Sequence, residues 1–168
     1  KNLALNTSIL HPEIQEFIIR NTGADLTKLA LQKNPFPEVD WILILNQIEA
    51  RTKAKEKLPT WFTSENILYP SKISVEQTSS ERTAAYKASL ISGKSLIDLT
   101  GGFGVDDYYF SKKFESITHC EINEELSAIV SYNFKQLKVK NCTFYAGDSS
   151  YLLEESNQKF DWIYIDPS

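Results

Sequence analysis

The sequence predicts an α/β protein in which a parallel sheet of four strands follows a small helical region. After residue 71, four runs rich in β-branched and aromatic residues alternate with helix-like runs. Strands separated by helices are joined by right-handed crossovers, which make the strands parallel and cover both faces of the sheet. Residues 1–70 show helical periodicity instead, so we expect a helical domain and linker at 1–70 and a sheet-containing domain at 71–168.

The composition is typical of a soluble globular protein, with 42% hydrophobic and 24% charged residues among 168. A net charge of −4 gives no general basic footprint, so nucleic-acid binding would need a local patch or another part of the protein. No apolar run reaches the roughly 18 residues of a membrane span, so no membrane association is expected. Cys120 and Cys142 lie in strand-like segments, where we expect reduced core thiols of a cytoplasmic protein.

The helical region is expected to open with two short helices. Pro12 suits the first turn of a helix that continues through 13–20. Asp25 can cap a second helix at 26–33, which ends before a proline-containing turn.

A longer helix is expected from Glu38 to about Lys57. Its apolar stripe follows three-residue spacing and consists of Val39, Ile42, Leu45 and Ile48. The basic last turns, 51–57, suit the negative end of the helix dipole. A solvated face is the favoured interpretation of this run, and a phosphate-contacting patch is the alternative. Pro59 ends the helix, and a linker with aromatic anchors leads to Pro70, the expected domain boundary.

The second domain begins with the pattern of a capping box. Thr78 and Glu81 have the spacing at which a hydroxyl and a carboxylate satisfy the free backbone donors of a helix at 82–91. The strands are expected at 95–99, 116–122, 142–147 and 160–166. The helices between them are expected at 105–114, 123–137 and 150–157.

A glycine-rich turn, "DLTGGFGVD" at 98–106, follows the first strand. In a parallel α/β sheet, ligands bind beyond the carboxyl ends of the strands. Gly101, Gly102 and Gly104 allow unusual backbone angles and let the backbone approach a ligand closely. We therefore expect a ligand site at this turn.

The turn favours a cationic ligand over a dinucleotide. The dinucleotide motif G-x-G-x-x-G would place its third glycine at position 107, which is Asp107. Asp106 and Asp107 stand where a pyrophosphate would meet the helix, and their charge repels phosphate. A nicotinamide enzyme is thus the weaker alternative. S-adenosylmethionine, which carries a sulfonium and an ammonium but no phosphate, fits better.

Residues 71–168 resemble the class I methyltransferases, whose first motif is acid-x-Gly-x-Gly-x-Gly after the first strand. The chain has Asp98 as the acid and Thr100 in place of the first glycine, a form seen in many RNA and DNA base methyltransferases. The resemblance implies a Rossmann-like sheet, of which this chain supplies strands in the order 3-2-1-4. It also implies that Asp98 lies near the methionine amino group of S-adenosylmethionine.

Acids at the next strand ends fit the same resemblance. Glu121 follows Asp98 by 23 positions, close to the roughly 20 residues of a βαβ unit, and would accept the ribose hydroxyls. Ile122 belongs to the same part of the expected cofactor site. Asp148 would accept from the adenine amino group, and Ser149 could add a backbone contact.

The fourth strand is followed by Asp166-Pro167-Ser168, where the family has its catalytic motif D/N-P-P-aromatic. The resemblance implies that Asp166 and the carbonyl of Pro167 accept hydrogens from an exocyclic amine and orient its lone pair. Ser168 departs from the pattern, which leaves the target atom open.

The segments 76–88 ("EQTSSERTAAYKA") and 98–106 together resemble a narrower bacterial group, the THUMP-like RNA methyltransferase-related proteins. This likeness implies that Gln77, Thr78 and Ser79 close over the cofactor. Helix capping alone is the alternative for these three residues.

Each site residue also has a purely structural interpretation. Asp98 could cap a helix, Glu121 could be a helix-start acid, and Asp148 could be an N-cap. Asp166 before proline could start a turn, and His119 more simply packs within its strand. No metal site is expected.

The sequence therefore supports two hypotheses about function, which belong to different classes. The first is an S-adenosylmethionine-dependent methyltransferase acting on an RNA base. The second is a non-catalytic RNA-binding or interaction module that keeps the fold.

The two ends of the sequence suggest a truncated piece. The chain begins with lysine, contains no methionine and stops directly after an apolar strand. Such a strand would form an open sheet edge, which invites pairing with a second copy. Alone, the chain is expected to bind the cofactor weakly and to methylate poorly.

Overall fold

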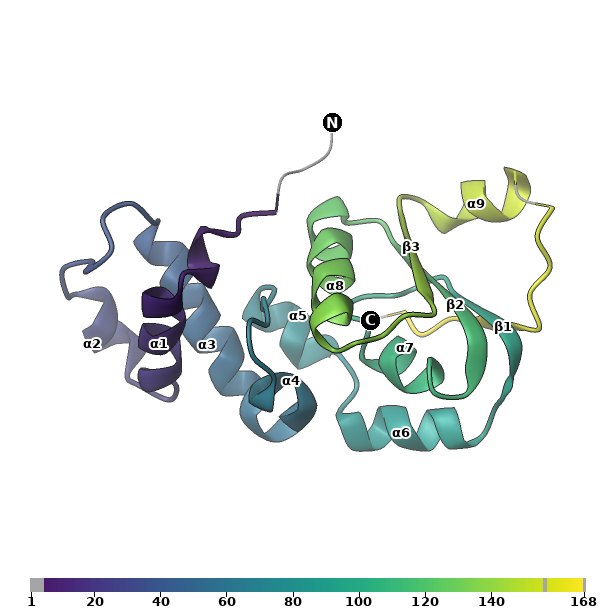
Figure 1. Cartoon of the computed structure of the whole chain (residues 1–168), viewed down its shortest axis with the longest axis horizontal. Coiled ribbons are helices and arrows are strands. Elements are labelled where there is room, and N and C mark those ends of the chain that lie inside the picture. Colours follow the sequence, from purple (N-terminus) through teal and green to yellow (C-terminus); the bar gives the residue numbers. More distant parts are fainter. Residues whose placement is uncertain (1–4, 156, 168) are drawn as a thin grey trace.

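The computed structural model describes residues 5–155 and 157–167, and it places a helical region beside an α/β region (Figure 1). The helical region comprises η1 (Ser8–Leu10), α1 (Pro12–Arg20), α2 (Leu26–Ala30), α3 (Trp41–Lys57), α4 (Pro59–Thr63) and α5 (Lys72–Gln77). The α/β region comprises α6 (Glu81–Ser89), β1 (Gly93–Asp98), α7 (Val105–Phe110), β2 (Phe114–Glu121), α8 (Glu124–Gln136), β3 (Cys142–Ala146), α9 (Ser149–Glu155) and β4 (Trp162–Tyr164).

The four strands form one parallel sheet in the order β3-β2-β1-β4, which confirms the predicted fold class and strand order. Asp98 pairs with His119 on one side and with Tyr164 on the other, so β1 and β4 end level and β2 extends two residues further, to Glu121. The expected ligand-binding residues therefore meet at one edge of the sheet. Strand β4 lies at the outside of the sheet, where Ile163 is 55% exposed, and Ile165 just after the strand is 59% exposed.

Helix α2 begins as predicted but is shorter. Asp25 Oδ1 accepts from the backbone N–H groups of Thr27 and Lys28 at 3.1 and 3.2 Å. The helix ends at Ala30 rather than at residue 33. The next residues form a turn in which the Asn34 side chain bonds the backbone of Phe36 and Val39.

The apolar stripe predicted for α3 is wrong in part. Ile42 is 65% exposed, whereas Ile48 is fully buried as expected. The buried face instead runs through Ile44, Ile48 and Ala54. A strict three-residue spacing drifts around a helix of 3.6 residues per turn, so it cannot follow one face over several turns.

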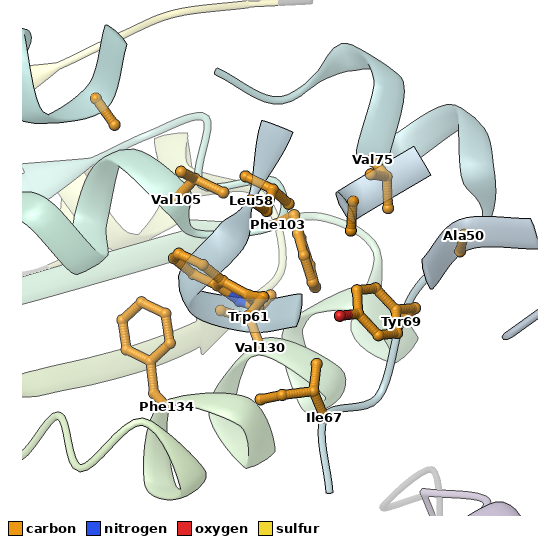
Figure 2. Packing of buried hydrophobic residues seen from close by; sticks show 12 residues of the cluster. Ala50, Leu58, Trp61, Ile67, Tyr69, Val75, Phe103, Val105, Val130 and Phe134 are labelled. Carbon is orange, nitrogen blue, oxygen red and sulfur yellow. The ribbon is translucent and has the colours of Figure 1, made fainter. Parts of the chain in front are cut away.

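The linker contains more helix than the sequence predicted. Pro59 ends α3 as expected, but it also begins α4, because proline suits the first position of a helix. Helix α4 buries Trp61 completely. Figure 2 shows this indole in a cluster with Tyr69, Phe103, Val130 and Phe134. The cluster joins both regions of the chain, and the boundary at Pro70 stays a prediction.

Two buried amide side chains fix the linker. Gln47 on α3 donates from Nε2 to Tyr69 O at 2.6 Å and accepts from Tyr69 N at 2.9 Å. Asn133 on α8 makes the same pair of bonds with Leu68, at 2.7 and 2.9 Å. Successive residues of the linker are therefore held from opposite sides.

The predicted capping box at Thr78 is wrong. Helix α6 begins at Glu81, and its N-cap is Ser80, whose Oγ accepts from Thr83 N at 3.1 Å. The Glu81 carboxylate accepts instead from Thr60 N at 2.6 Å, and also from the hydroxyls of Thr60 and Tyr109. These donors on α4 and α7 hold the Glu81 carboxylate away from the free backbone N–H groups at the start of α6.

Two further features concern the described residues alone. None of their helices has both the length and the apolar character that crossing a membrane requires. Cys120 and Cys142 are free thiols; Cys120 is buried, as expected of a core residue, whereas Cys142 is only partly buried.

Candidate functional site

A cavity of about 670 Å³ lies at the carboxyl ends of the strands. Most of the residues predicted for the site line it. They are Gln77, Thr78, Ser79, Asp98, Thr100, Gly101, Gly102, Glu121, Ile122, Asp148, Ser149, Asp166 and Pro167. Ser168 lies outside the described residues.

The glycine turn crosses closely over β2. Gly101 N donates to Cys120 O at 2.8 Å, and a Cβ on Gly101 would collide with the imidazole of His119. His119 is fully buried and lies within 3.1 Å of Gly102 O through Nε2, which agrees with a packing role. The turn thus needs glycine at position 101 for close approach to the strand below.

Gly104 does not belong to the cavity lining, in contrast to the prediction. It is the N-cap of α7 with a φ of 77°, in the left-handed region. A Cβ there would lie 2.7 Å from Val130 Cγ1 and 3.0 Å from Phe134 Cε1. Among the described residues, Gly104 therefore serves the packing of the turn against α8.

Asp98 lies under the turn and is only 2% exposed. Its Oδ1 accepts from Thr100 N at 2.8 Å and from Thr100 Oγ1 at 3.1 Å. Burial raises the pKa of Asp98 to about 7, against the opposing effect of these hydrogen bonds.

Asp107 is fully buried rather than facing the cavity, which corrects its expected place beside a ligand. Burial, followed by the charge of Asp98, raises the pKa of Asp107 well above its usual range. Of the two acids at the start of α7, Asp106 is the one that lines the cavity.

Glu121 is held at the end of β2 by two backbone donors. Its Oε2 accepts from Gly102 N at 3.0 Å, and its Oε1 accepts from Asn123 N at 2.8 Å. Asn123 rather than Glu121 caps α8. Each oxygen keeps acceptor capacity for a ligand, and Ile122 lies beside it at 73% exposure.

Asp148 both lines the cavity and caps the next helix. Its Oδ1 accepts from Ser150 N at 2.9 Å and from Ser150 Oγ at 2.6 Å, which lowers the pKa of Asp148. Ser149 donates from Oγ to Leu99 O at 3.5 Å. The capping interpretation and the binding interpretation of Asp148 therefore both stand.

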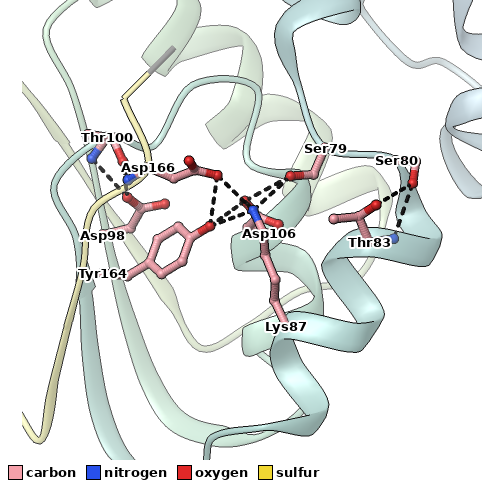
Figure 3. Close-up of polar contacts among 9 residues, drawn as sticks. All are labelled: Ser79, Ser80, Thr83, Lys87, Asp98, Thr100, Asp106, Tyr164 and Asp166. Atoms are coloured by element: carbon pink, nitrogen blue, oxygen red, sulfur yellow. Dashed lines mark hydrogen bonds and ion pairs between the residues drawn. The ribbon is translucent and has the colours of Figure 1, made fainter.

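Asp166 is fixed at its backbone and at its side chain, as Figure 3 shows. Its N–H donates to Thr100 Oγ1 at 2.8 Å. Its Oδ2 accepts from Lys87 Nζ at 2.7 Å and lies 3.1 Å from the Tyr164 hydroxyl oxygen. The bond from Lys87 is the main cause of the lowered pKa of Asp166.

The sequence analysis missed Lys87 and Tyr164. Tyr164 stands two positions before Asp166, so strand alternation places both on the same side, and this signal was available. Lys87 lies in the segment 76–88, but its contact with a strand end 79 positions later depends on the tertiary structure.

The segment between α5 and α6 also reaches the cavity, through Gln77, Thr78 and Ser79. Ser79 Oγ lies 2.9 Å from Lys87 Nζ and 3.3 Å from Asp106 Oδ2.

The basic run at 51–57 is engaged largely by the chain itself. Lys53 pairs with Glu76 at 3.1 Å, and Lys57 donates to the carbonyl of Glu76. The Arg51 guanidinium lies 4.2 Å from the centre of the Phe62 ring. These contacts favour the solvated face over a phosphate-contacting patch.

Comparison with solved structures identifies the fold of the chain. The chain superimposes on the crystal structure of a candidate methyltransferase from Porphyromonas gingivalis W83 with a TM-score of 0.80 and 28% identity. The match covers 97% of this chain and 41% of that one. The chain has a class I methyltransferase-like fold. The P. gingivalis match extends over the helical region as well, so both regions of the chain recur together.

Other matches cover less. No protein-family model matches the chain. An uncharacterized RNA methyltransferase from Clostridium acetobutylicum is 35% identical over 77 residues, which are 46% of this chain and 17% of that protein. A candidate RNA methyltransferase structure from Pyrococcus horikoshii aligns with a TM-score of 0.47 at 23% identity, over 68% of this chain and 59% of that one. The chain thus spans less than half the length of the first two relatives.

Proposed function

We propose that the chain forms the S-adenosylmethionine-binding part of a methyltransferase that acts on an RNA base. One observation carries the proposal: carboxylates from the ends of all four strands surround one cavity beside a glycine turn. The description of the C. acetobutylicum relative as an RNA methyltransferase supports RNA as the substrate class. The narrower likeness to the THUMP-like group remains part of the proposal.

The cavity suits S-adenosylmethionine in size and charge. Its volume of about 670 Å³ lies within the range of roughly 300–1,000 Å³ for small-molecule sites. The lining contains carboxylates and, among the described residues, no lysine or arginine, which favours a cationic ligand without phosphate. Asp98 would hold the ammonium, Glu121 the ribose hydroxyls and Asp148 the adenine amino group.

The bound cofactor would supply an electrophilic methyl group on a sulfonium. Asp166 and the carbonyl of Pro167 would accept hydrogens from a target amine and aim its lone pair, so positioning provides most of the catalysis. The pKa of Asp166 is lowered from its usual range, so at neutral pH its side chain would be a carboxylate that accepts hydrogen bonds.

The acidic lining also bears on how RNA would approach. The carboxylates of the lining would repel phosphates, so we propose that only the base enters the cavity. The phosphate contacts that RNA affinity requires would come from other parts of the protein.

Calorimetric titration with S-adenosylmethionine tests the proposal. Glu121→Gln removes the charge that strengthens hydrogen bonds to the ribose, so its affinity should fall roughly tenfold to a hundredfold. Glu115→Gln is the matched control, because Glu115 is exposed near the opposite end of the same strand. No binding by the wild-type chain, or equal binding by both variants, would favour the non-catalytic module.

A further inference from the structure

Lys87 has no task in the proposed reaction, yet it is the centre of a cluster beside Asp166. Its Nζ lies 2.7 Å from Asp166 Oδ2, 2.7 Å from the Tyr164 hydroxyl, 2.9 Å from Ser79 Oγ and 3.0 Å from Asp106 Oδ2. Figure 3 shows the ammonium reaching these four groups from α6. The contacts join segments that are separate in the sequence.

One assignment of hydrogens gives the Lys87 ammonium and both hydroxyl groups of the cluster an acceptor. The three ammonium hydrogens go to Asp166, Tyr164 and Ser79. The two hydroxyls then donate to Asp106 Oδ2, at 2.8 Å from Tyr164 and 3.3 Å from Ser79. Lys87 forms an ion pair with each carboxylate and is their shared counter-charge.

This counter-charge matters because the cavity is so acidic. Oxygens of Asp106 and Asp166 lie within 3.0 Å of the same nitrogen. Without the ammonium, two like charges would face each other, and one carboxylate would take up a proton or turn away. Lys87 thus decides the charge and the orientation of Asp166.

We propose that Lys87 is a positioning residue for methyl transfer, which fixes one oxygen of Asp166 and leaves the other to accept a hydrogen from the target amine. The inference rests on the proposed function. Thr100 anchors the backbone of Asp166 and Lys87 anchors its side chain, so the free oxygen has a defined direction.

The test is the titration of the Asp166 carboxyl by ¹³C NMR on the full chain, with the signal assigned by its loss in Asp166→Asn. Lys87→Met keeps the side-chain length but removes the charge. The midpoint of Asp166 should then rise from below the usual aspartate range into that range or above it. Arg82→Met, at an exposed position on the same helix, is the matched control and should leave the midpoint unchanged.

A second measurement covers the case in which Lys87→Met does not fold. In the wild-type chain, burial lowers the pKa of Lys87, but the hydrogen bond that it donates to Asp166 and the negative charges of Asp106 and Asp166 raise it overall. The ammonium of Lys87 should therefore titrate at lower pH in Asp166→Asn. The inference would be overturned if the titration midpoint of Asp166 did not change in Lys87→Met, or if that of Lys87 did not change in Asp166→Asn.

Cofactor binding separates the inference from the proposed function. Lys87→Met should change the affinity for S-adenosylmethionine by less than about threefold, because Lys87 acts on Asp166 rather than on the cofactor. A much larger loss would contradict the positioning role. A wild-type chain that binds no S-adenosylmethionine would refute the proposed function, whereas an unresponsive Asp166 would refute only the inference.

Discussion

Replacing Gly104 with alanine tests whether this glycine serves packing rather than ligand binding. Its φ of 77° costs an alanine about 1–2 kcal/mol. The added Cβ would also lie 2.7 Å from Val130 Cγ1, and such overpacking costs about 1–3 kcal/mol. We therefore expect Gly104→Ala to lower the free energy of unfolding by about 2–5 kcal/mol.

Gly23→Ala is the matched control for the backbone contribution. Gly23 has a φ of 84°, but nothing lies within 4 Å of the position of its Cβ. Its replacement should cost only the conformational part, about 1–2 kcal/mol. Urea denaturation followed by circular dichroism gives both free energies, and unchanged m-values show that the same transition is compared. Equal losses in the two variants would refute the packing role of Gly104.

Two further predictions concern Asp98 and the open edge. Burial raises the pKa of Asp98 to about 7, so the native state binds its proton more tightly than the unfolded chain, and stability falls as pH rises from about 4 to about 7. Asp98→Asn should therefore melt at a higher temperature than wild type near pH 8 and at a similar temperature near pH 4; a pH-independent difference would contradict the burial of a titrating carboxyl. Ile163 on the edge strand and Ile165 just after it should make the chain self-associate with rising concentration in sedimentation velocity, and Ile163→Lys should suppress this; identical profiles would exclude pairing through β4.

The sheet and the residues at its carboxyl edge could be predicted because their signals are local. Strand-like runs gave the four strands, and the turn at 98–106 gave the first ligand-binding segment. Parallel strands end at the same edge, so Glu121, Asp148 and Asp166 were expected to gather near Asp98. The roles of these residues in binding stay predictions.

The features that the sequence did not predict depend on tertiary contacts. Thr78 and Glu81 match a capping box, but Glu81 is recruited by donors on α4 and α7, so Ser80 caps the helix instead. Lys87 looks like an ordinary exposed lysine until β4 brings Asp166 to it. No rule of periodicity or spacing predicts a contact between residues 79 positions apart, such as Lys87 and Asp166.

The paired amides of Gln47 and Asn133 tie the stability of the helical region to that of the sheet. If the chain were severed at Pro70, Asn133 would lose both partners on Leu68, and Phe103 and Phe134 would lose the cover of Trp61. A buried amide without partners and newly exposed aromatic rings would together cost a large part of the free energy of unfolding of so small a sheet. Heat or denaturant should therefore unfold the entire chain in one cooperative step, because the amino-terminal helices and the sheet share one set of buried contacts.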